Sequence, residues 1–301
     1  MININKCKFD YGDEKMEITE FKVDSSEKFK ISKSKTNYSD KTYKKDELED
    51  LLDKNIEKIS ELQSKLYAQG QYGVLIIIQA MDAAGKDGAI KHVMTGLNPQ
   101  GVHVTSFKQP SSEELNHDYL WKAHNNMPER GQIGIFNRSY YEELLVVRVH
   151  NLLKNENIPK EFIGDYIWEN RYSEVKNFEK YLYENAIIPI KIFLNVSKDE
   201  QKNRLLARID DKAKNWKFSE ADMKEREFWD DYQKCYEEVI ENTNSKDVPW
   251  YVVPADNKKL ARLIISQILE KTLKGLNLEY PSLSEEQSVL LDDYKKKLEK
   301  N

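Results

Sequence analysis

One stretch of the sequence, at residues 74–90, constrains the fold more than any other. It reads VLIIIQAMDAAGKDGAI, which is a run of branched apolar residues, a turn of small residues, and apolar positions at helical spacing. This pattern predicts a buried strand, a tight loop and a helix. The first N–H groups of such a helix have no partner within it and lie at the positive end of its dipole. Lys86 adds a full charge there, so the stretch predicts a phosphate-binding loop.

The loop departs from the usual phosphate-binding motif, G-x-x-x-x-G-K-[ST], at two fixed positions. Ala80 stands at the first glycine position, and Asp87 stands where the motif has Ser or Thr. That hydroxyl normally binds magnesium, so another protein ligand is needed here. Asp82 is the candidate, because hard cations prefer carboxylate oxygen. The alternative interpretation is a strand that turns into a helix at a chance Gly-Lys pair.

The rest of the chain alternates between strand and helix patterns. Further strands are predicted at residues 101–107, 132–136, 187–196 and 248–253, and helices at 46–70, 111–126, 139–153, 159–185, 198–209, 219–241, 257–273 and 284–301. Strands that alternate with helices predict a parallel sheet with helices on both faces. We therefore expect an α/β fold of the P-loop kinase kind, with a five-stranded sheet and a helical lid.

The expected phosphotransferase domain covers residues 45–280, and a charged C-terminal helix follows at 281–301. Residues 1–44 form an N-terminal extension, for which a solvated tail is the first interpretation. A functional basic arm is the alternative, because lysines recur within it at nearly alternating positions. These lysines are Lys28, Lys30, Lys33 and Lys35.

Composition excludes several classes of function. The net charge of −5 argues against a general nucleic-acid binder, which needs an excess of Lys and Arg. No apolar run approaches the ~20 residues needed to span a bilayer, and the N-terminus has no signal-peptide core. We therefore expect a cytoplasmic protein without a membrane partner. Cys7 and Cys235 lie too far apart in the sequence, without further ligand patterns, to indicate disulfides or zinc.

Polar residues follow the ends of the predicted strands. In an open parallel sheet, ligands bind beyond the carboxyl ends of the strands. Asp82 and Lys86 follow the first strand, Lys108 follows the second, and Asn137 and Arg138 follow the third. The fork of an arginine suits phosphate oxygens, so Arg138 is the leading candidate among the residues outside the loop.

A second basic group follows the fourth strand. Arg204 and Arg208 are four residues apart, which places both on one face of a helix, and three lysines continue the charge through residues 210–218. One interpretation is a solvated basic face paired with nearby carboxylates. The other is a mobile lid, at about residues 204–226, whose arginines close over phosphates during transfer.

Four segments in this order resemble the signatures of the polyphosphate kinase 2 family. They lie at residues 81–88, 135–150, 208–219 and 249–256, and the resemblance runs from about residue 45 to 273. The segment with Phe-Asn-Arg-Ser and Val-Val-Arg-Val-His is similar to the class III subclass, which accepts nucleoside mono- and diphosphates. Other members carry Asp at the position of Asn137, so their second magnesium carboxylate is absent here.

The resemblance implies reversible transfer of a terminal phosphoryl group from inorganic polyphosphate to AMP and ADP, or to guanosine equivalents, with ATP among the products. It implies Mg²⁺, with Mn²⁺ as an alternative, and a homo-oligomer, either dimer or tetramer. An ATP-dependent nucleoside monophosphate kinase of similar fold is the main alternative. A non-catalytic nucleotide sensor or scaffold is the third.

The resemblance also implies roles for individual residues. Asp82, Lys86, Arg138, Arg204 and Arg208 would be catalytic, and Asp82 would bind the metal, with Asn137 as a second candidate ligand. The expected phosphate contacts in the loop are Ala83, Ala84, Gly85, Lys86, Asp87 and Gly88. A polyphosphate chain also needs a basic track, for which the candidates are Lys91, Lys108, Arg130 and Arg148.

Overall fold

A computed structural model describes residues 17–38 and 44–300 of the chain. Helix α1 (Lys45–Gln69) begins the predicted domain and ends at Gly70. The φ angle of Gly70 is 62°, in the left-handed region that glycine adopts without a steric penalty, so the chain can turn there into the first strand.

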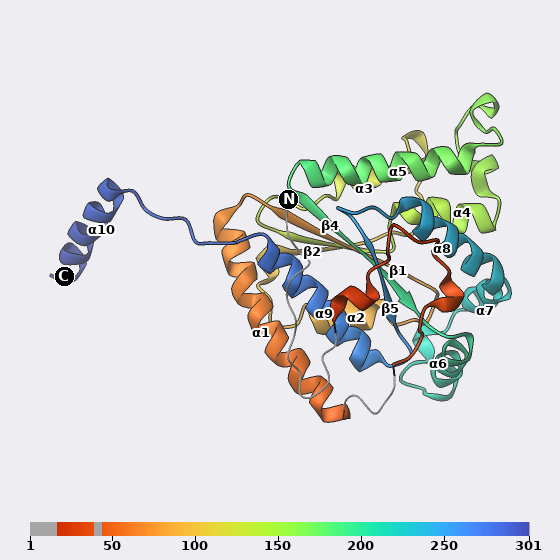
Figure 1. The fold of residues 1–301 in the computed structure, drawn as a ribbon, viewed down its shortest axis with the longest axis horizontal. Coiled ribbons are helices and arrows are strands. Elements are labelled where there is room, and N and C mark those ends of the chain that lie inside the picture. Colours follow the sequence, from red (N-terminus) through yellow and green to blue (C-terminus); the bar gives the residue numbers. More distant parts are fainter. Residues whose placement is uncertain (1–16, 39–43, 301) are drawn as a thin grey trace.

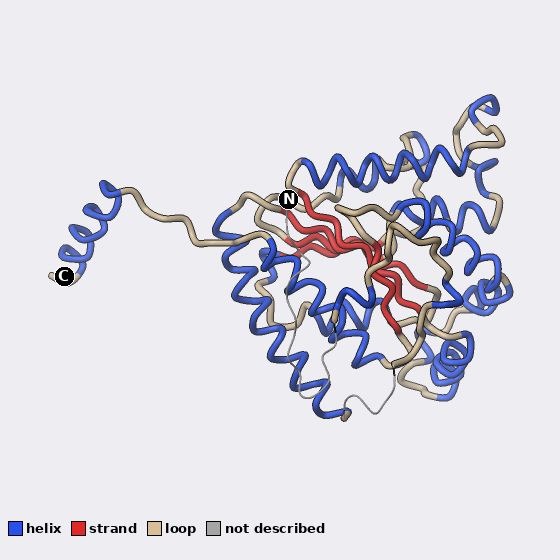
Figure 2. Tube along the Cα trace, viewed as in Figure 1, coloured by secondary structure: helices blue, strands red, loops and turns tan. Residues whose placement is uncertain are grey.

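The strands form one parallel sheet, as predicted. They are β1 (Gly73–Ala80), β2 (Val102–Ser106), β3 (Ile133–Asn137), β4 (Ile187–Asn195) and β5 (Trp250–Pro254). Their order is β2-β3-β1-β4-β5, and every neighbouring pair is parallel. The strands lie together in the middle of the domain, with helices around them (Figure 2). All residues of β1 are buried, because this strand lies at the centre of the sheet with helices over both faces.

Helices cover the sheet on both sides (Figure 1). α1, α2 (Lys86–Val93) and α9 (Lys258–Gly275) pack together on one face. The other face carries α4 (Val146–Val149), α5 (Ile167–Glu184) and α8 (Trp229–Thr243). Within the described residues, no helix is both long and apolar enough to cross a bilayer. Cys235 is a free, buried thiol, and Cys7 lies outside the described residues.

Several predicted helices are shorter or divided. The helix predicted at 111–126 is a 3₁₀ turn, Glu114–Asn116, followed by the short α3 (Trp121–Asn125). The helix at 139–153 is divided into 3₁₀ helices, Tyr140–Leu144 and Leu152–Asn155, on either side of α4. The helix at 219–241 is broken at Phe228 between α7 (Glu220–Glu227) and α8, because α7 has no buried face while α8 packs into the core.

The prediction of a solvated N-terminal tail is wrong for residues 17–38, which we call the N-terminal segment. Ile18, Phe21 and Val23 are buried against the domain. The backbone N–H of Val23 donates to the carbonyl of Trp250 at 2.9 Å, so the segment adds to the edge strand β5. The C-terminal helix α10 (Glu285–Leu298), by contrast, has no buried residue and stands away from the domain (Figure 1).

Candidate active site

The loop between β1 and α2 has the shape that the sequence predicts for phosphate binding. Gly85 is the N-cap of α2 with φ 109°, and Ala83 has φ 60°. A left-handed alanine costs about 1 kcal/mol, so the surrounding contacts must hold this backbone in place. The turn brings the N-terminal N–H groups of α2 to the carboxyl edge of the sheet, where an anion can accept from them.

Lys86 turns back over the end of β1. Its Nζ donates to the carbonyl oxygens of Ala80 at 2.8 Å and Met81 at 3.4 Å. Burial lowers the pKa of Lys86, and the positive charge of Arg138 lowers it further. A phosphate bound here would offset both effects on the pKa of Lys86, because its negative charge would lie beside Lys86 and Arg138.

Asp82 and Arg138 form the ion pair that faces this lysine. Arg138 Nη2 lies 2.6 Å from Asp82 Oδ1, and Nη1 lies 3.1 Å from Glu142 Oε2. Glu142 in turn accepts from Gln79 at 3.1 Å. Burial would lower the pKa of Arg138, but the two carboxylates hold it above its ordinary value. The guanidinium is therefore charged and oriented at the phosphate loop.

Asn137 is turned towards the phosphate loop as well. Its Nδ2 donates to Asp87 Oδ1 at 2.8 Å, which links the end of β3 to the first turn of α2. Three oxygen-bearing side chains, Asp82, Asp87 and Asn137, thus belong to the elements around the loop. Within the described residues there is no group of three or more His, Cys, Asp and Glu that could hold a metal.

Arg204 on α6 (Lys198–Asp210) is buried and fastens the phosphate loop. Its Nη1 donates to the carbonyls of Ala83 at 3.2 Å and Ala84 at 2.6 Å. Its Nη2 donates to the carbonyls of Ala255 at 2.6 Å and Asp256 at 3.0 Å. This guanidinium therefore joins the loop to the end of β5. Its predicted action from a mobile lid remains a prediction, since here the fork points at backbone oxygens.

Arg204→Ala should lower both stability and activity. Truncation leaves four carbonyl oxygens without this donor in a buried place, which should cost about 3 kcal/mol or more. The melting temperature should fall by roughly 6–12 °C, measured by thermal unfolding. Arg208→Ala is the matched control and should melt within a few degrees of the wild type. A normal melting temperature for Arg204→Ala would contradict this role.

Arg208 lies on the same helix but faces α7. Its Nη1 lies 2.5 Å from Asp222 Oδ2. Burial raises the pKa of Asp222, and the negative charge of Asp82 raises it further. The negative charge of Asp82 in the phosphate loop thus acts on Asp222, so α7 lies near this loop. The assignment of residues 204–226 as a lid remains a prediction.

The four track candidates lie in different places. Lys91 on α2 and Lys108 after β2 are exposed. Lys108 lies at the carboxyl edge of the sheet, because the N–H of the preceding Phe107 donates to the carbonyl of Asn137. Arg148 is paired with Glu238 at 2.6 Å and therefore has its charge balanced.

The structure contradicts a phosphate role for Arg130. Its Nη2 donates to the carbonyl of Asn185, just before β4, at 3.0 Å. Arg130 thus lies at the amino ends of the strands. β4 has nine residues, so the phosphate loop is ~25–30 Å away.

Two cations on α9 belong to the site and were not predicted. A Cβ atom built on Gly88 would lie 3.4 Å from Arg262 Nη2, so this guanidinium rests against the loop. Burial lowers the pKa of Lys258, and nearby Arg204 and Arg262 lower it further. The signal was available, because Lys258 follows the fifth strand at the same carboxyl edge of the sheet.

Comparisons with known proteins find similar sequences and a similar structure. A sequence model of the family described as polyphosphate kinase 2 (PPK2) matches residues 41–281. An ADP-polyphosphate phosphotransferase of Rhodopseudomonas palustris is 49% identical over 269 residues, which cover 89% of this chain and 93% of that protein. An AMP/ADP-polyphosphate phosphotransferase of Meiothermus ruber is 44% identical over 231 residues, 77% of this chain and 82% of that protein. The crystal structure of polyphosphate kinase 2 from Arthrobacter aurescens TC1 has a TM-score of 0.81 at 38% identity, covering 90% of this chain and 95% of that chain.

Proposed function

Because this chain belongs to the polyphosphate kinase 2 family, we propose that it transfers a terminal phosphoryl group between inorganic polyphosphate and the nucleotides AMP and ADP. The observation that supports this most is the meeting of Lys86, Arg138 and Asp82 at the phosphate loop. Phosphoryl transfer needs in-line positioning and balanced charge more than covalent chemistry, and this group of side chains provides both. The chain is thus an enzyme, a phosphotransferase.

The residues of the site have different roles in the proposed transfer, according to their positions. The N–H groups at the start of α2 and the Lys86 ammonium hold the phosphoryl group that moves. Arg138 stands across from them and binds the phosphate on the other side of the transfer, while Glu142 keeps its fork oriented. Arg204 acts as a positioning residue, because it holds the carbonyls of Ala83 and Ala84 and so the shape of the loop.

We further propose Mg²⁺ as the metal, with Mn²⁺ able to replace it. The residues present fit a hard cation, because Asp82, Asp87 and Asn137 offer oxygen ligands beside the loop. Mg²⁺ usually takes one or two carboxylates and completes its shell with substrate phosphates and water, which suits a site with few protein ligands. Asp82 would hold the ion, and the bound ion would neutralise phosphate charge.

The acceptor range is the finer part of the proposal. The class III resemblance of the segment that begins at Ile135 supports both AMP and ADP as acceptors, with the guanosine equivalents as further candidates. Transfer should be reversible, because the phosphoanhydride bonds broken and formed are of the same kind. A cytoplasmic location and a homo-oligomer, dimer or tetramer, also remain proposals.

A product analysis tests the function. The enzyme is incubated with Mg²⁺, AMP and long-chain polyphosphate, and nucleotides are separated over time by chromatography. We expect ADP first and then ATP, with no nucleoside triphosphate supplied. If ADP forms only when ATP replaces polyphosphate as the donor, the protein is an ATP-dependent nucleoside monophosphate kinase. Nucleotide binding without product from either donor would indicate a sensor or scaffold.

A further inference from the structure

The N-terminal segment crosses the carboxyl ends of β4 and β5 close to the phosphate loop. Asn195 Nδ2, at the end of β4, donates to the carbonyl of Lys35 at 3.1 Å. The N–H of Asp256, just after β5, donates to the carbonyl of Thr36 at 2.9 Å. The carbonyl of Asp256 also accepts from Arg204, which holds the loop. The segment is therefore fastened beside the site by the same residues that shape the site.

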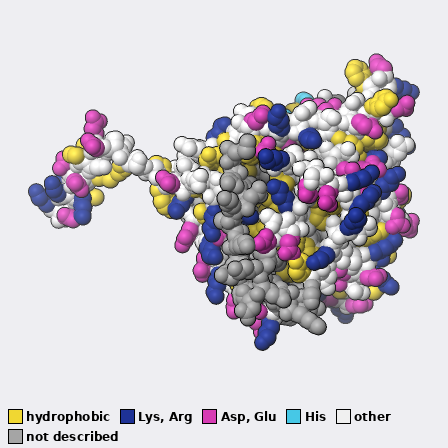
Figure 3. All heavy atoms as spheres, in the orientation of Figure 1, with side chains coloured by type: hydrophobic (Ala, Val, Ile, Leu, Met, Phe, Trp, Pro, Cys, Tyr) yellow, Lys and Arg dark blue, Asp and Glu magenta, His cyan; other side chains and the backbone are white. Residues whose placement is uncertain are grey.

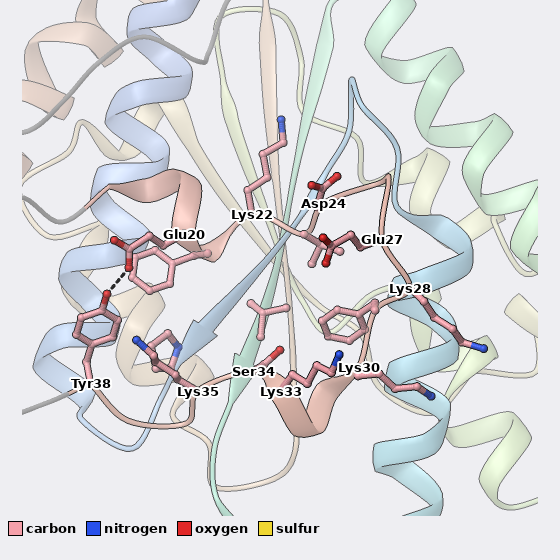
Figure 4. Close-up of a pocket in the computed structure, with 15 residues that line it drawn as sticks. Glu20, Lys22, Asp24, Glu27, Lys28, Lys30, Lys33, Ser34, Lys35 and Tyr38 are labelled. Atoms are coloured by element: carbon pink, nitrogen blue, oxygen red, sulfur yellow. Dashed lines mark hydrogen bonds between the residues drawn. The ribbon is translucent and has the colours of Figure 1, made fainter.

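The N-terminal segment and β5 enclose an open hollow of about 300 Å³. Figure 4 shows four lysines that follow one another along the lower rim of this hollow: Lys28, Lys30, Lys33 and Lys35. Its acidic residues lie higher, at Glu20, Asp24 and Glu27. Lys and Arg side chains also gather on the right half of the face shown in Figure 3. The hollow thus has a positive lower rim, on the side where the strands end.

Among the described residues, three of the four rim lysines make no ion pair with a carboxylate. Lys30 is paired with Glu237. Lys28 and Lys33 are exposed and make no ion pair with any residue that the structure describes, although the charge of Lys28 helps to lower the pKa of Glu237. Lys35 is exposed too, and its Nζ lies 4.4 Å from the centre of the Tyr38 ring. Unpaired charges of one sign along a rim attract an anion that can contact several of them at once.

Cations continue from this rim to the phosphate loop. Lys258 follows Asp256 by two residues, and the N–H of Asp256 donates to the N-terminal segment. Arg262, one helical turn further along α9, rests against Gly88 of the loop. Neither Lys258 nor Arg262 makes an ion pair within the described part of the chain, and burial and then the charges of Arg204 and Arg262 lower the pKa of Lys258. Lys258 and Arg262 thus place two positive charges between the rim and the phosphate loop, near the carboxylates of Glu200 and Asp256.

We propose that Lys28, Lys33 and Lys35 bind the part of a polyphosphate chain that extends beyond the phosphate loop. The proposal rests on the proposed function and adds a second contact region for the donor. Polyphosphate carries a negative charge on each unit and is flexible, so it can leave the loop past Arg262 and Lys258 and lie along the rim. A donor of three or four phosphates occupies only the phosphate loop and does not contact the rim lysines. The rim therefore favours long donors over short ones.

A triple variant, Lys28→Gln, Lys33→Gln and Lys35→Gln, tests the proposal by kinetics with two donors. Glutamine keeps most of the side-chain stem and removes the charge. We expect KM for long-chain polyphosphate to rise about tenfold with kcat unchanged, while KM for tetrapolyphosphate stays the same. Each lost phosphate contact also removes counterion release, so the slope of log KM against log salt should fall by about 2 for long chains.

The control is the triple variant Lys295→Gln, Lys296→Gln and Lys297→Gln on α10, which removes the same charge from a helix that stands away from the domain. It should leave both KM values unchanged. The proposal is overturned if the rim variant changes neither KM, changes both donors equally, or matches the α10 variant. A rise in the nucleotide KM alone would also overturn it and assign the rim to the acceptor. If the wild type uses no polyphosphate of any length, the proposed function fails instead.

Discussion

Lys86→Ala should lower kcat/KM by about 10³-fold while the protein remains folded. Lys86 brings its ammonium to the end of β1, beside Arg138 and the first turn of α2. Removing one such preorganised charge from a transfer site costs about 10²–10³-fold, and the loss is largest where water is excluded. The measurement is the rate of ATP formation from ADP and polyphosphate, with circular dichroism to check the fold.

Two further variants sharpen this result. Lys86→Arg keeps the charge but not the compact shape, so it should recover only a small part of the rate. Lys58→Ala removes an exposed lysine from the outer side of α1 and should be as active as the wild type. Activity of Lys86→Ala within about tenfold of the wild type would contradict the assignment of the loop as the transfer site.

Asp82→Asn should lower kcat by about 10²–10³-fold and raise the Mg²⁺ concentration that gives half-maximal activity. Asparagine is of the same size but carries no charge, so it weakens the pair with Arg138 and offers a poorer ligand to a hard cation. The measurement is a Mg²⁺ titration of initial rates at fixed polyphosphate and ADP.

Glu142→Gln separates the two roles of Asp82. Glu142 is the other carboxylate bonded to Arg138, so its loss disturbs the orientation of Arg138 without removing the proposed metal ligand. We expect a smaller loss of rate and an unchanged Mg²⁺ requirement. If Asp82→Asn and Glu142→Gln behave alike in the Mg²⁺ titration, Asp82 acts through Arg138 and does not hold the metal.

The sheet and the loop could be predicted because their signals are local. Runs of branched apolar residues mark β1 and β4, β-branched or aromatic residues recur in the other three strands, and the small residues before Lys86 mark the turn. Helix ends were less predictable. The break at Phe228 separates an exposed helix from a buried one, and only tertiary packing makes that difference. The buried N-terminal segment was missed because Phe21 and Val23 lie among lysines that suggested a solvated tail.

The long-range part of the site could not be predicted. The acceptors of Arg204 are carbonyls of residues about 120 and 50 positions away. Every residue has a backbone oxygen, so the sequence does not indicate which of them accept. The misplacement of Arg130 was avoidable, because it precedes the strand at Ile133 and so had to lie at the amino end. The same rule, applied after the fifth strand, would have found Lys258.

The most direct test of the central claim is label transfer from ³²P-polyphosphate to unlabelled ADP by the wild type and by Lys86→Ala. We expect the label in the terminal phosphate of ATP, in proportion to the ATP formed, and about 10³-fold less transfer by Lys86→Ala. Release of the label as free phosphate without labelled ATP, or equal transfer by both proteins, would contradict this expectation.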